Sequence, residues 1–185
     1  LVLVSHSHAL ALAARELALG VSEGGDLPIA ACGGVGDEHE ELGTDATEIV
    51  EAIEAVGSEE GVLLLMDLGS ALLSAEMAVE LVGGTFPVRL CPAPLVEGAV
   101  AAAVQLSMGS DLETIYTEAV SALEPKRDQL GEPAARQTTP AEPTPATTPQ
   151  NESSELIERR FIVRTPHGLH ARPAAQFVRA VSASG

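Results

Sequence analysis

The sequence predicts an α/β domain whose sheet is mostly parallel and is covered by helices on both faces. Short apolar runs alternate along the chain with longer stretches that have the periodicity of amphipathic helices. One run, Gly61–Met66, is apolar throughout, as expected of a central parallel strand that is buried on both sides. Aromatic residues make up 2% of the chain and hydrophobic residues 45%, so we expect a core of alanine, valine, leucine and isoleucine.

The first half of the chain supplies two predicted strands and two predicted helices. Leu1–Ser5 is a short apolar run that ends in polar residues, and His8–Gly20 is an alanine- and leucine-rich helix that stops at a glycine. Leu27–Cys32 is the second apolar run and leads into a glycine-rich loop. Thr44–Val56 places its isoleucines and a valine on one face and its glutamates on the other, which predicts an amphipathic helix.

The second half continues the alternation. The third strand, Gly61–Met66, is followed by a helix over Ser70–Val82 and a fourth strand over Pro87–Cys91. Two further helices are predicted over Val96–Leu106 and Asp111–Leu123. Because parallel strands need crossover connections, this order predicts a sheet with ligands at the carboxyl ends of its strands.

A proline-rich stretch, Gly131–Ser153, interrupts this pattern. It has no apolar periodicity and no basic residues around a PxxP motif, so it is interpreted as an extended linker rather than a docking peptide. We therefore divide the chain into an α/β domain over 1–130, a linker over 131–155 and a small α/β piece over 156–185. The last piece begins with a predicted strand, Leu156–Val163.

Charge separates these three parts. The whole chain has 27 acidic and 10 basic residues and a net charge of −17. Residues 1–130 carry a net charge of −18, residues 131–155 carry −3 and residues 156–185 carry +4. Nucleic acid is not expected as a partner, because phosphate contacts need clustered lysine and arginine.

Other classes are also disfavoured. The longest apolar stretches are far below the roughly 20 residues that cross a bilayer, so no membrane association is expected. The N-terminus shows no secretory signal, and Cys32 and Cys91 form no CxxC motif, so we expect a cytoplasmic protein with two buried thiols of no assigned role.

Polar residues follow the first and third predicted strands. His6 ends the first strand, where an imidazole beside a helix N-terminus can accept a phosphoryl group. Asp67 ends the third strand and is placed to accept the other ring N–H, which would fix the tautomer of His6. Asp67 is alternatively the N-cap of the helix that follows. His6 and His8 also have HxH spacing, but no further ligand follows at metal-site spacing, so no metal is predicted.

Three neighbouring residues are predicted to hold the phosphate. The backbone amides near Gly69 and Ser70 begin a helix and would face phosphate oxygens, and the hydroxyls of Ser70 and Thr44 would add donors. Thr44, followed by Asp45, is equally well interpreted as a helix cap.

The tail contains a sharper motif, Pro166-His167-Gly168-Leu169-His170-Ala171-Arg172-Pro173-Ala174-Ala175. Pro173 suits the first turn of a helix, so His170 would stand just before a helix N-terminus with Arg172 beside it. That arrangement fits a histidine that accepts and donates a phosphoryl group. The alternative is a helix-capping histidine with an incidental arginine, and His167 has no assigned role.

These motifs carry a family resemblance. The segment "TPHGLHARPAA" resembles the active-site signature of HPr, the histidine phosphocarrier of the bacterial phosphotransferase system. The segments "LVLVSHS", "GTDATEIVEAIE", "MDLGSALLSAEMA" and "LCPAPLVEGAVAAAVQLS" resemble the phosphotransfer subunit of the phosphoenolpyruvate-dependent dihydroxyacetone kinase, whose first domain is similar to mannose-family enzyme IIA.

The resemblance implies a relay without a bound cofactor. Enzyme I and HPr would deliver the phosphoryl group through Nδ1 of His170 to Nε2 of His6, and the acceptor would be ADP in the nucleotide-binding subunit of the kinase. The resemblance also implies a phosphotransferase component that forms a homodimer, with Asp67 as the carboxylate partner of His6. The HPr-like piece is incomplete at Gly185, and no enzyme I-like segment is present. Two alternatives stay open, a mannose-family enzyme IIA for sugar uptake and a regulatory phosphohistidine module.

Overall fold

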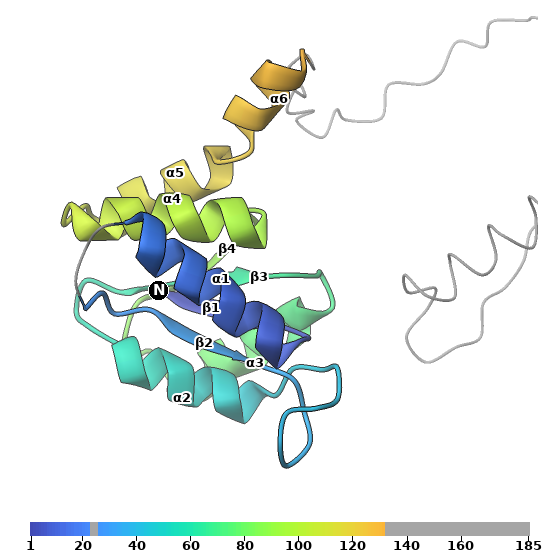
Figure 1. Cartoon of the computed structure of the whole chain (residues 1–185). Coiled ribbons are helices and arrows are strands. Elements are labelled where there is room, and N and C mark those ends of the chain that lie inside the picture. The colour runs from blue at the N-terminus through green and yellow to red at the C-terminus, as the bar shows by residue number, and fades with distance from the viewer. Residues whose placement is uncertain (23–25, 132–185) are drawn as a thin grey trace, which may run out of the picture. The chain divides into compact units, whose positions relative to one another are not determined.

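The structure is a computed structural model that describes residues 1–22 and 26–131. The chain divides into two units after Gln137, and only the first contains described residues. The predicted linker beyond Gly131 and the HPr-like piece, with His170 and Arg172, lie outside the described part. The elements of the first unit alternate as Figure 1 shows: β1 (Val2–Ser5), α1 (His8–Val21), β2 (Ala30–Gly33), α2 (Ala46–Val56), β3 (Val62–Met66), α3 (Ala71–Val82), β4 (Val88–Cys91), α4 (Leu95–Ser107), α5 (Leu112–Ser121) and α6 (Glu124–Leu130).

The sheet has four parallel strands in the order β2-β1-β3-β4. The two central strands, β1 and β3, pair with Val2 opposite Leu64 and Val4 opposite Met66. The α/β class and the parallel sheet predicted from the alternation are therefore confirmed. All four carboxyl ends lie on one edge, and the ends of β1 and β3 are next to each other.

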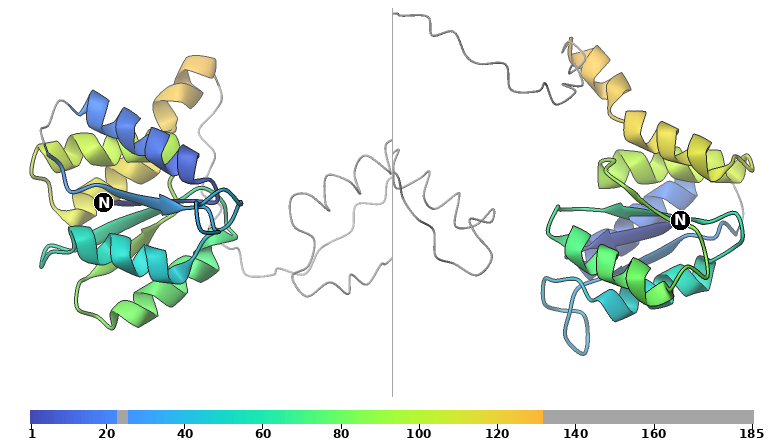
Figure 2. Two further views of the ribbon diagram at one scale, coloured as in Figure 1. Left: turned by 60° about the horizontal axis from the view of Figure 1, so that its bottom comes forward. Right: turned by 180° about the vertical axis from the view of Figure 1, so that it is seen from behind.

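Side chains of the central strands alternate between two cores. Leu3, Leu63 and Leu65 face one side and pack against α1, α4 and α5. Val4 and Leu64 face the other side and pack against α2 and α3. Figures 1 and 2 show these two layers of helices on opposite faces of the sheet. Burial on both faces explains why β3 has no polar residue.

The helices pack closely because their buried positions are mostly alanine. Each of α1, α3 and α4 turns a row of small side chains toward the sheet (Ala11, Ala14 and Ala18; Ala71, Ala75 and Ala78; Ala99, Ala102 and Ala103). At Gly98 a Cβ atom would lie 2.7 Å from the Cβ of Ala93 and 2.8 Å from a methyl of Leu65. The core therefore consists mostly of small and aliphatic side chains at the contacts between the helices and the sheet.

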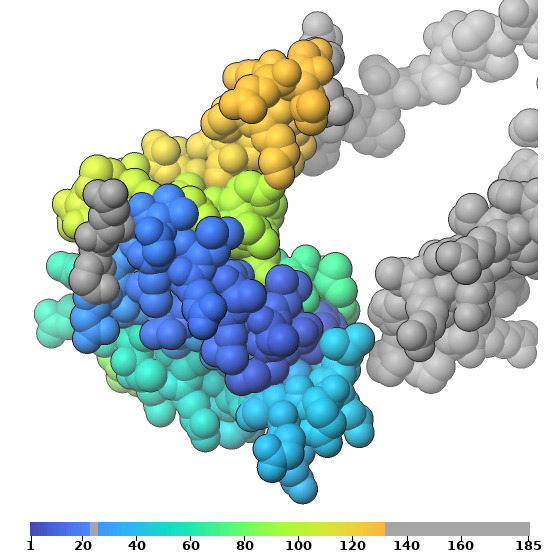
Figure 3. All heavy atoms as spheres, in the orientation of Figure 1, coloured from blue at the N-terminus to red at the C-terminus, as the bar shows by residue number. Residues whose placement is uncertain are grey.

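The structure differs from the sequence-based elements at two places. The second strand begins at Ala30 rather than Leu27, because the residues before it only lead into the sheet. The predicted helix over Asp111–Leu123 ends at Ser121, and α6 follows it with a proline in its first turn. No residue of α6 is buried, and Figure 3 shows this helix standing on the surface beyond α5. Without a buried face, α6 has no apolar periodicity to reveal it in the sequence.

Candidate functional site

The carboxyl ends of β1 and β3 and the loop before α2 meet at one edge of the sheet. The amide of Asp67 donates to the carbonyl of Val4 (3.1 Å), and the amide of Gly43 donates to the carbonyl of His6 (2.9 Å). These bonds extend the strand pairing by one residue and bring together segments that are far apart in sequence. Of the residues predicted for the site, His6, Asp67 and Ser70 are in direct contact.

The His6 side chain is fixed by the carboxylate of Asp67. His6 Nδ1 lies 2.9 Å from Asp67 Oδ1, and the backbone amide of His6 donates to Oδ2 at 2.8 Å. The two side chains are 23% and 12% exposed, respectively. The histidine is therefore held on both its backbone and its ring while part of the ring still reaches the surface.

The Asp67 carboxylate accepts four hydrogen bonds in all. Besides the two from His6, the hydroxyl of Ser5 donates to Oδ2 at 2.9 Å and the amide of Leu68 donates to Oδ1 at 2.7 Å. Burial opposes ionisation of this carboxyl, but the hydrogen bonds from His6 and Ser5 outweigh it and hold its pKa below the ordinary value. An ionised Asp67 accepts a hydrogen bond from the Nδ1–H group, so the lone pair of the neutral ring lies on Nε2.

The free nitrogen of His6 faces the start of α3. Nε2 lies 2.9 Å from the hydroxyl oxygen of Ser70, which makes no hydrogen bond as a cap of its own helix. Among the described residues, the amides of Gly69 and Ser70 donate to no protein acceptor. A helix N-terminus with free amides beside a nucleophilic nitrogen is suited to hold the oxygens of an anionic group.

Two capping alternatives are settled by these contacts. Asp67 does not cap α3, because its oxygens bond to Ser5, His6 and Leu68 instead. The cap of α2 is Asp45, whose carboxylate accepts from the amides of residues 47 and 48.

Thr44 is oriented away from His6. Its hydroxyl pairs with the hydroxyl of Ser74 at 2.9 Å, which joins the loop to the second turn of α3. Thr44 was predicted to bind phosphate, but its hydroxyl forms no hydrogen bond with His6.

His8 belongs to a different environment from His6. Its Nδ1 lies 3.1 Å from the carbonyl oxygen of Gly33, and its ring stacks on His39 with 4.6 Å between centroids. Nδ1 of His39 lies 3.2 Å from a carboxylate oxygen of Glu48. In the part of the chain that the structure describes, no group of three histidine, cysteine, aspartate or glutamate side chains is arranged to hold a metal ion.

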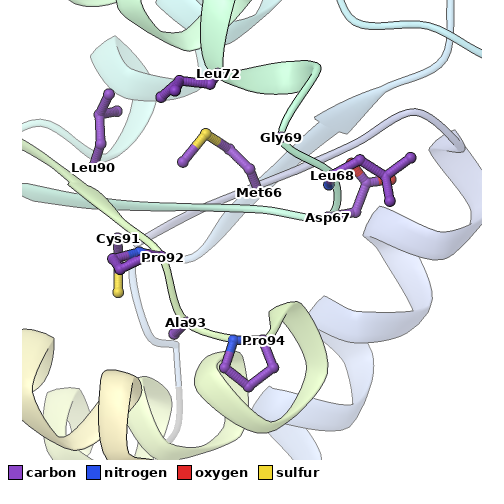
Figure 4. Close-up of a pocket in the computed structure, with 10 residues that line it drawn as sticks. All are labelled: Met66, Asp67, Leu68, Gly69, Leu72, Leu90, Cys91, Pro92, Ala93 and Pro94. Carbon is purple, nitrogen blue, oxygen red and sulfur yellow. The ribbon is translucent and has the colours of Figure 1, made fainter. Parts of the chain in front are cut away.

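An apolar pocket of about 510 Å³ opens beside Asp67. Figure 4 shows that its lining comes from the ends of β3 and β4, the first turn of α3 and the segment that leads into α4. Leu68 and Leu72 lie on its α3 side, and Leu68 is 55% exposed. Leu73 and Met77 are also exposed on α3. The sequence motifs did not indicate an apolar surface beside Asp67, because single leucines in a helix are usually core residues.

No basic side chain within residues 1–131 contacts His6 in the described structure. Arg15 donates to the backbone carbonyl of Ile29, just before β2. Arg89 pairs with Glu113, and Lys126 pairs with Glu97. Arg127 lies on α6. Among the described residues, this candidate site therefore offers hydroxyl and amide donors but no cation.

Sequence reasoning also missed Ser5, which is fully buried and bonded to Asp67. Its position was visible only as the residue before His6. No helix among the described residues is long and apolar enough to cross a membrane.

Two family models match the chain. The model of the PTS system fructose IIA component matches residues 1–116, and that of the PTS HPr component phosphorylation site matches residues 157–184.

Curated relatives match between 64% and 98% of this chain. The PEP-dependent dihydroxyacetone kinase phosphoryl donor subunit DhaM of Escherichia coli is 41% identical over 98% of this chain, and that of Pantoea ananatis is also 41% identical. The chain spans 38% of the length of each of these two relatives. The dihydroxyacetone kinase 2 subunit DhaM of Listeria innocua is 38% identical and is matched over 94% of its length and 64% of this chain.

Two solved structures resemble about two thirds of this chain. A structure called unknown function protein EF1359 has a TM-score of 0.53 and 30% identity, over 65% of this chain and 91% of that chain. A sigma-54 interaction domain protein from Enterococcus faecalis has a TM-score of 0.52 and 19% identity, over 69% of this chain and 93% of that chain, and shows the fold alone.

Proposed function

This chain belongs to the family of DhaM phosphoryl donor subunits, with an EIIA-man part and an HPr part, and on that basis we propose that it carries phosphoryl groups on His6 and His170. The group originates from phosphoenolpyruvate and reaches the chain through enzyme I and HPr. It leaves from His6 to ADP bound in the nucleotide-binding subunit of dihydroxyacetone kinase. The chain is thus a phosphotransferase component of the cytoplasm, where phosphoenolpyruvate is available.

The observation that carries this proposal is the orientation of His6 by Asp67. Because Asp67 accepts a hydrogen bond from Nδ1–H, Nε2 keeps its lone pair and points to the open side, next to Ser70. In the transfer, the Nε2 lone pair forms the new N–P bond while the N–P bond of the donor phosphohistidine breaks and returns its electron pair to the donor nitrogen. Asp67 stabilises the positive charge that the His6 ring then carries.

The start of α3 completes the acceptor site. The hydroxyl of Ser70 and the amides of Gly69 and Ser70 donate hydrogen bonds to the oxygens of the transferring group, whose charge is spread over them. Since no cation lies next to His6 among the described residues, the donor must supply one. Arg172, two residues after His170, is the side chain in this sequence that fits that role.

A protein donor and acceptor suit the surroundings of the site better than a free small molecule. The neighbouring pocket is apolar and includes the exposed side chain of Leu68, and Leu73 and Met77 are also exposed on α3. Apolar surface next to a reactive group is typical of protein interfaces. The net charge of −18 on residues 1–130 would attract a basic donor such as the segment 156–185, with +4.

The test is stoichiometric phosphorylation of the full chain with phosphoenolpyruvate, enzyme I and HPr. Mass spectrometry of intact and digested protein should find one acid-labile phosphoryl group on His6 and one on His170. The variant His6→Ala should lose the label within residues 1–131, and His8→Gln, which changes the neighbouring histidine, should keep it. Labelling of residues 1–131 in His6→Ala would contradict the assignment.

The acceptor is identified in a second step. Phosphorylated protein should pass its label to ADP in the presence of the nucleotide-binding subunit and support phosphorylation of dihydroxyacetone. Transfer to an enzyme IIB protein instead would favour the sugar-uptake alternative, and a stable phosphorylated form that none of these acceptors discharges would favour the regulatory one. Light scattering of the same sample tests the homodimer that the resemblance implies.

A further inference from the structure

Ser5 is the last residue of β1 and lies directly before the proposed phosphoryl acceptor. It is fully buried, and Ser22 is the other polar residue that is buried among those the structure describes. A buried hydroxyl lowers stability unless it is hydrogen-bonded, so its partners indicate why it is there.

The direction of the Ser5 hydroxyl is fixed by the start of α1. Its oxygen accepts a hydrogen bond from the amide of Ser7 at 3.0 Å, and Ser7 is the N-cap of that helix. Because an amide N–H can only donate, the hydroxyl proton of Ser5 must point elsewhere. It points to Asp67 Oδ2, 2.9 Å away.

With this bond, each of the two oxygens of the Asp67 carboxylate accepts two hydrogen bonds. Oδ2 accepts from Ser5 and from the backbone of His6, and Oδ1 accepts from the His6 ring and from the backbone of Leu68. With two donors on each oxygen, the carboxylate plane cannot rotate without breaking a bond. The oxygen that faces the ring is thereby held at 2.9 Å from Nδ1.

We propose that Ser5 is a positioning residue, which acts on His6 only through Asp67 and keeps the reactive nitrogen in its lone-pair form. This inference rests on the proposed function of His6 as phosphoryl acceptor. Ser5 itself touches neither the ring nor the open side of the site, since its hydroxyl lies between α1 and the carboxylate. Its hydrogen bond is also among the contacts that keep Asp67 ionised, after those from His6.

Ser22 provides a matched control within the same chain. It is also a buried serine, and its hydroxyl donates to the backbone carbonyl of Leu19 at 3.1 Å, at the far end of α1. Ser5→Ala and Ser22→Ala therefore remove the same group, one before the start of α1 and one at its C-cap. Any general cost of deleting a buried hydroxyl is shared by the two variants.

The experiment combines transfer rates with nitrogen NMR of the His6 ring in the full-length protein. Ser5→Ala should accept the phosphoryl group from phosphorylated HPr about tenfold more slowly, the low end for a hydrogen bond to a charged group. The ¹⁵N shifts should show that the population with the proton on Nε2 rises, and the carboxyl titration of Asp67 should move to higher pH. Ser22→Ala should match the wild type in all three measurements.

A double variant separates positioning from a general structural role. In the Asp67→Ala background, Ser5→Ala should slow the transfer no further, because the carboxylate through which Ser5 acts on His6 is already absent. A further tenfold loss there, or an unchanged His6 tautomer in Ser5→Ala, would overturn the proposal. If Ser5→Ala does not fold, Ser5→Cys keeps a donor at this position, although a weaker and slightly larger one, and wild-type transfer and tautomer in that variant would equally overturn the proposal.

The two levels of the proposal fail in different ways. If His6 is not the acceptor, the wild-type protein shows no label on His6, while the tautomer and carboxyl titrations still report whether Ser5 acts on Asp67. If only the role of Ser5 is wrong, the wild type is labelled and Ser5→Ala behaves like Ser22→Ala.

Discussion

Replacing Asp67 with asparagine tests the central feature of the site while keeping its shape. The carboxylate accepts from four donors, two of which are backbone amides that cannot turn. An asparagine offers one acceptor oxygen and one NH₂ group. If the NH₂ group replaces Oδ1, it faces the backbone N–H of Leu68 and removes the acceptor for Nδ1 of His6. If it replaces Oδ2, it faces the backbone N–H of His6.

The magnitude follows from the bonds that are lost. Two of the four hydrogen bonds to a charged group disappear, each worth about 1.5–3 kcal/mol. At the lower figure the loss is about 3 kcal/mol, which slows a transfer that depends on the ring orientation by roughly two orders of magnitude. We expect Asp67→Asn to accept the phosphoryl group from phosphorylated HPr about 100-fold more slowly.

The assay is single-turnover transfer in a rapid-quench instrument, with phosphohistidine measured on residues 1–131. Asp45→Asn is the matched control, because it makes the same change at the cap of α2, on the same edge of the sheet, and asparagine is also a good cap. Transfer by Asp67→Asn within threefold of the wild type, or an equal loss in Asp45→Asn, would refute the role of Asp67.

The same variant has a pH signature. The pKa of Asp67 is lower in the folded protein than the ordinary 3.8, so its ionised form contributes stability above that value. This contribution is lost as the pH falls through the folded pKa. Urea unfolding should therefore show that the wild type is more stable than Asp67→Asn at pH 5, and this difference should shrink as the pH falls below about 4.

Three further predictions concern single positions. Gly33→Ala should lower the free energy of unfolding by more than about 3 kcal/mol or prevent folding, because its Cβ would lie 1.8 Å from the carbonyl oxygen of Ser5 at a φ of +145°; a urea midpoint near that of the wild type would contradict this. Burial raises the pKa of Cys32 to about 12, so iodoacetamide at pH 8 should alkylate it at least 100-fold more slowly in the native protein than in urea, and equal rates would refute the burial. Ser70→Ala should slow phosphoryl transfer to His6 about fivefold with an unchanged unfolding midpoint, since its hydroxyl bonds His6 and caps nothing; a lowered midpoint with normal transfer would show the opposite role.

Much of the fold was predictable because its determinants are local. The alternation of apolar runs with amphipathic stretches placed every strand of the described sheet, and the fully apolar β3 indicated burial on both faces. The exception, α6, buries nothing and so leaves no periodic pattern. Its proline in the first turn was the available signal, and a proline after a helix is as often the end of helical structure.

The sequence also indicated that two of the candidate site residues lie close together. His6 and Asp67 each end an apolar run, and parallel strands place their carboxyl ends on one edge, so their proximity followed from the strand pattern alone. What the pattern could not decide was which atoms bond. Thr44, expected at the phosphate, pairs with Ser74, while Ser5, expected only as part of a strand, bonds to the carboxylate.

Features that were predictable from the sequence differ physically from those that were not. Periodicity and strand ends depend on neighbours within a few residues, so the sequence by itself determined the α/β fold, the order of its elements and the edge at which His6 and Asp67 meet. The register of β1 against β3 and the rotamers at their ends depend on contacts between residues about sixty positions apart. Only the tertiary structure decided that Ser5 and Asp67 share a hydrogen bond, that Nδ1 is the nitrogen in contact with the carboxylate, and that Nε2 is left to face Ser70.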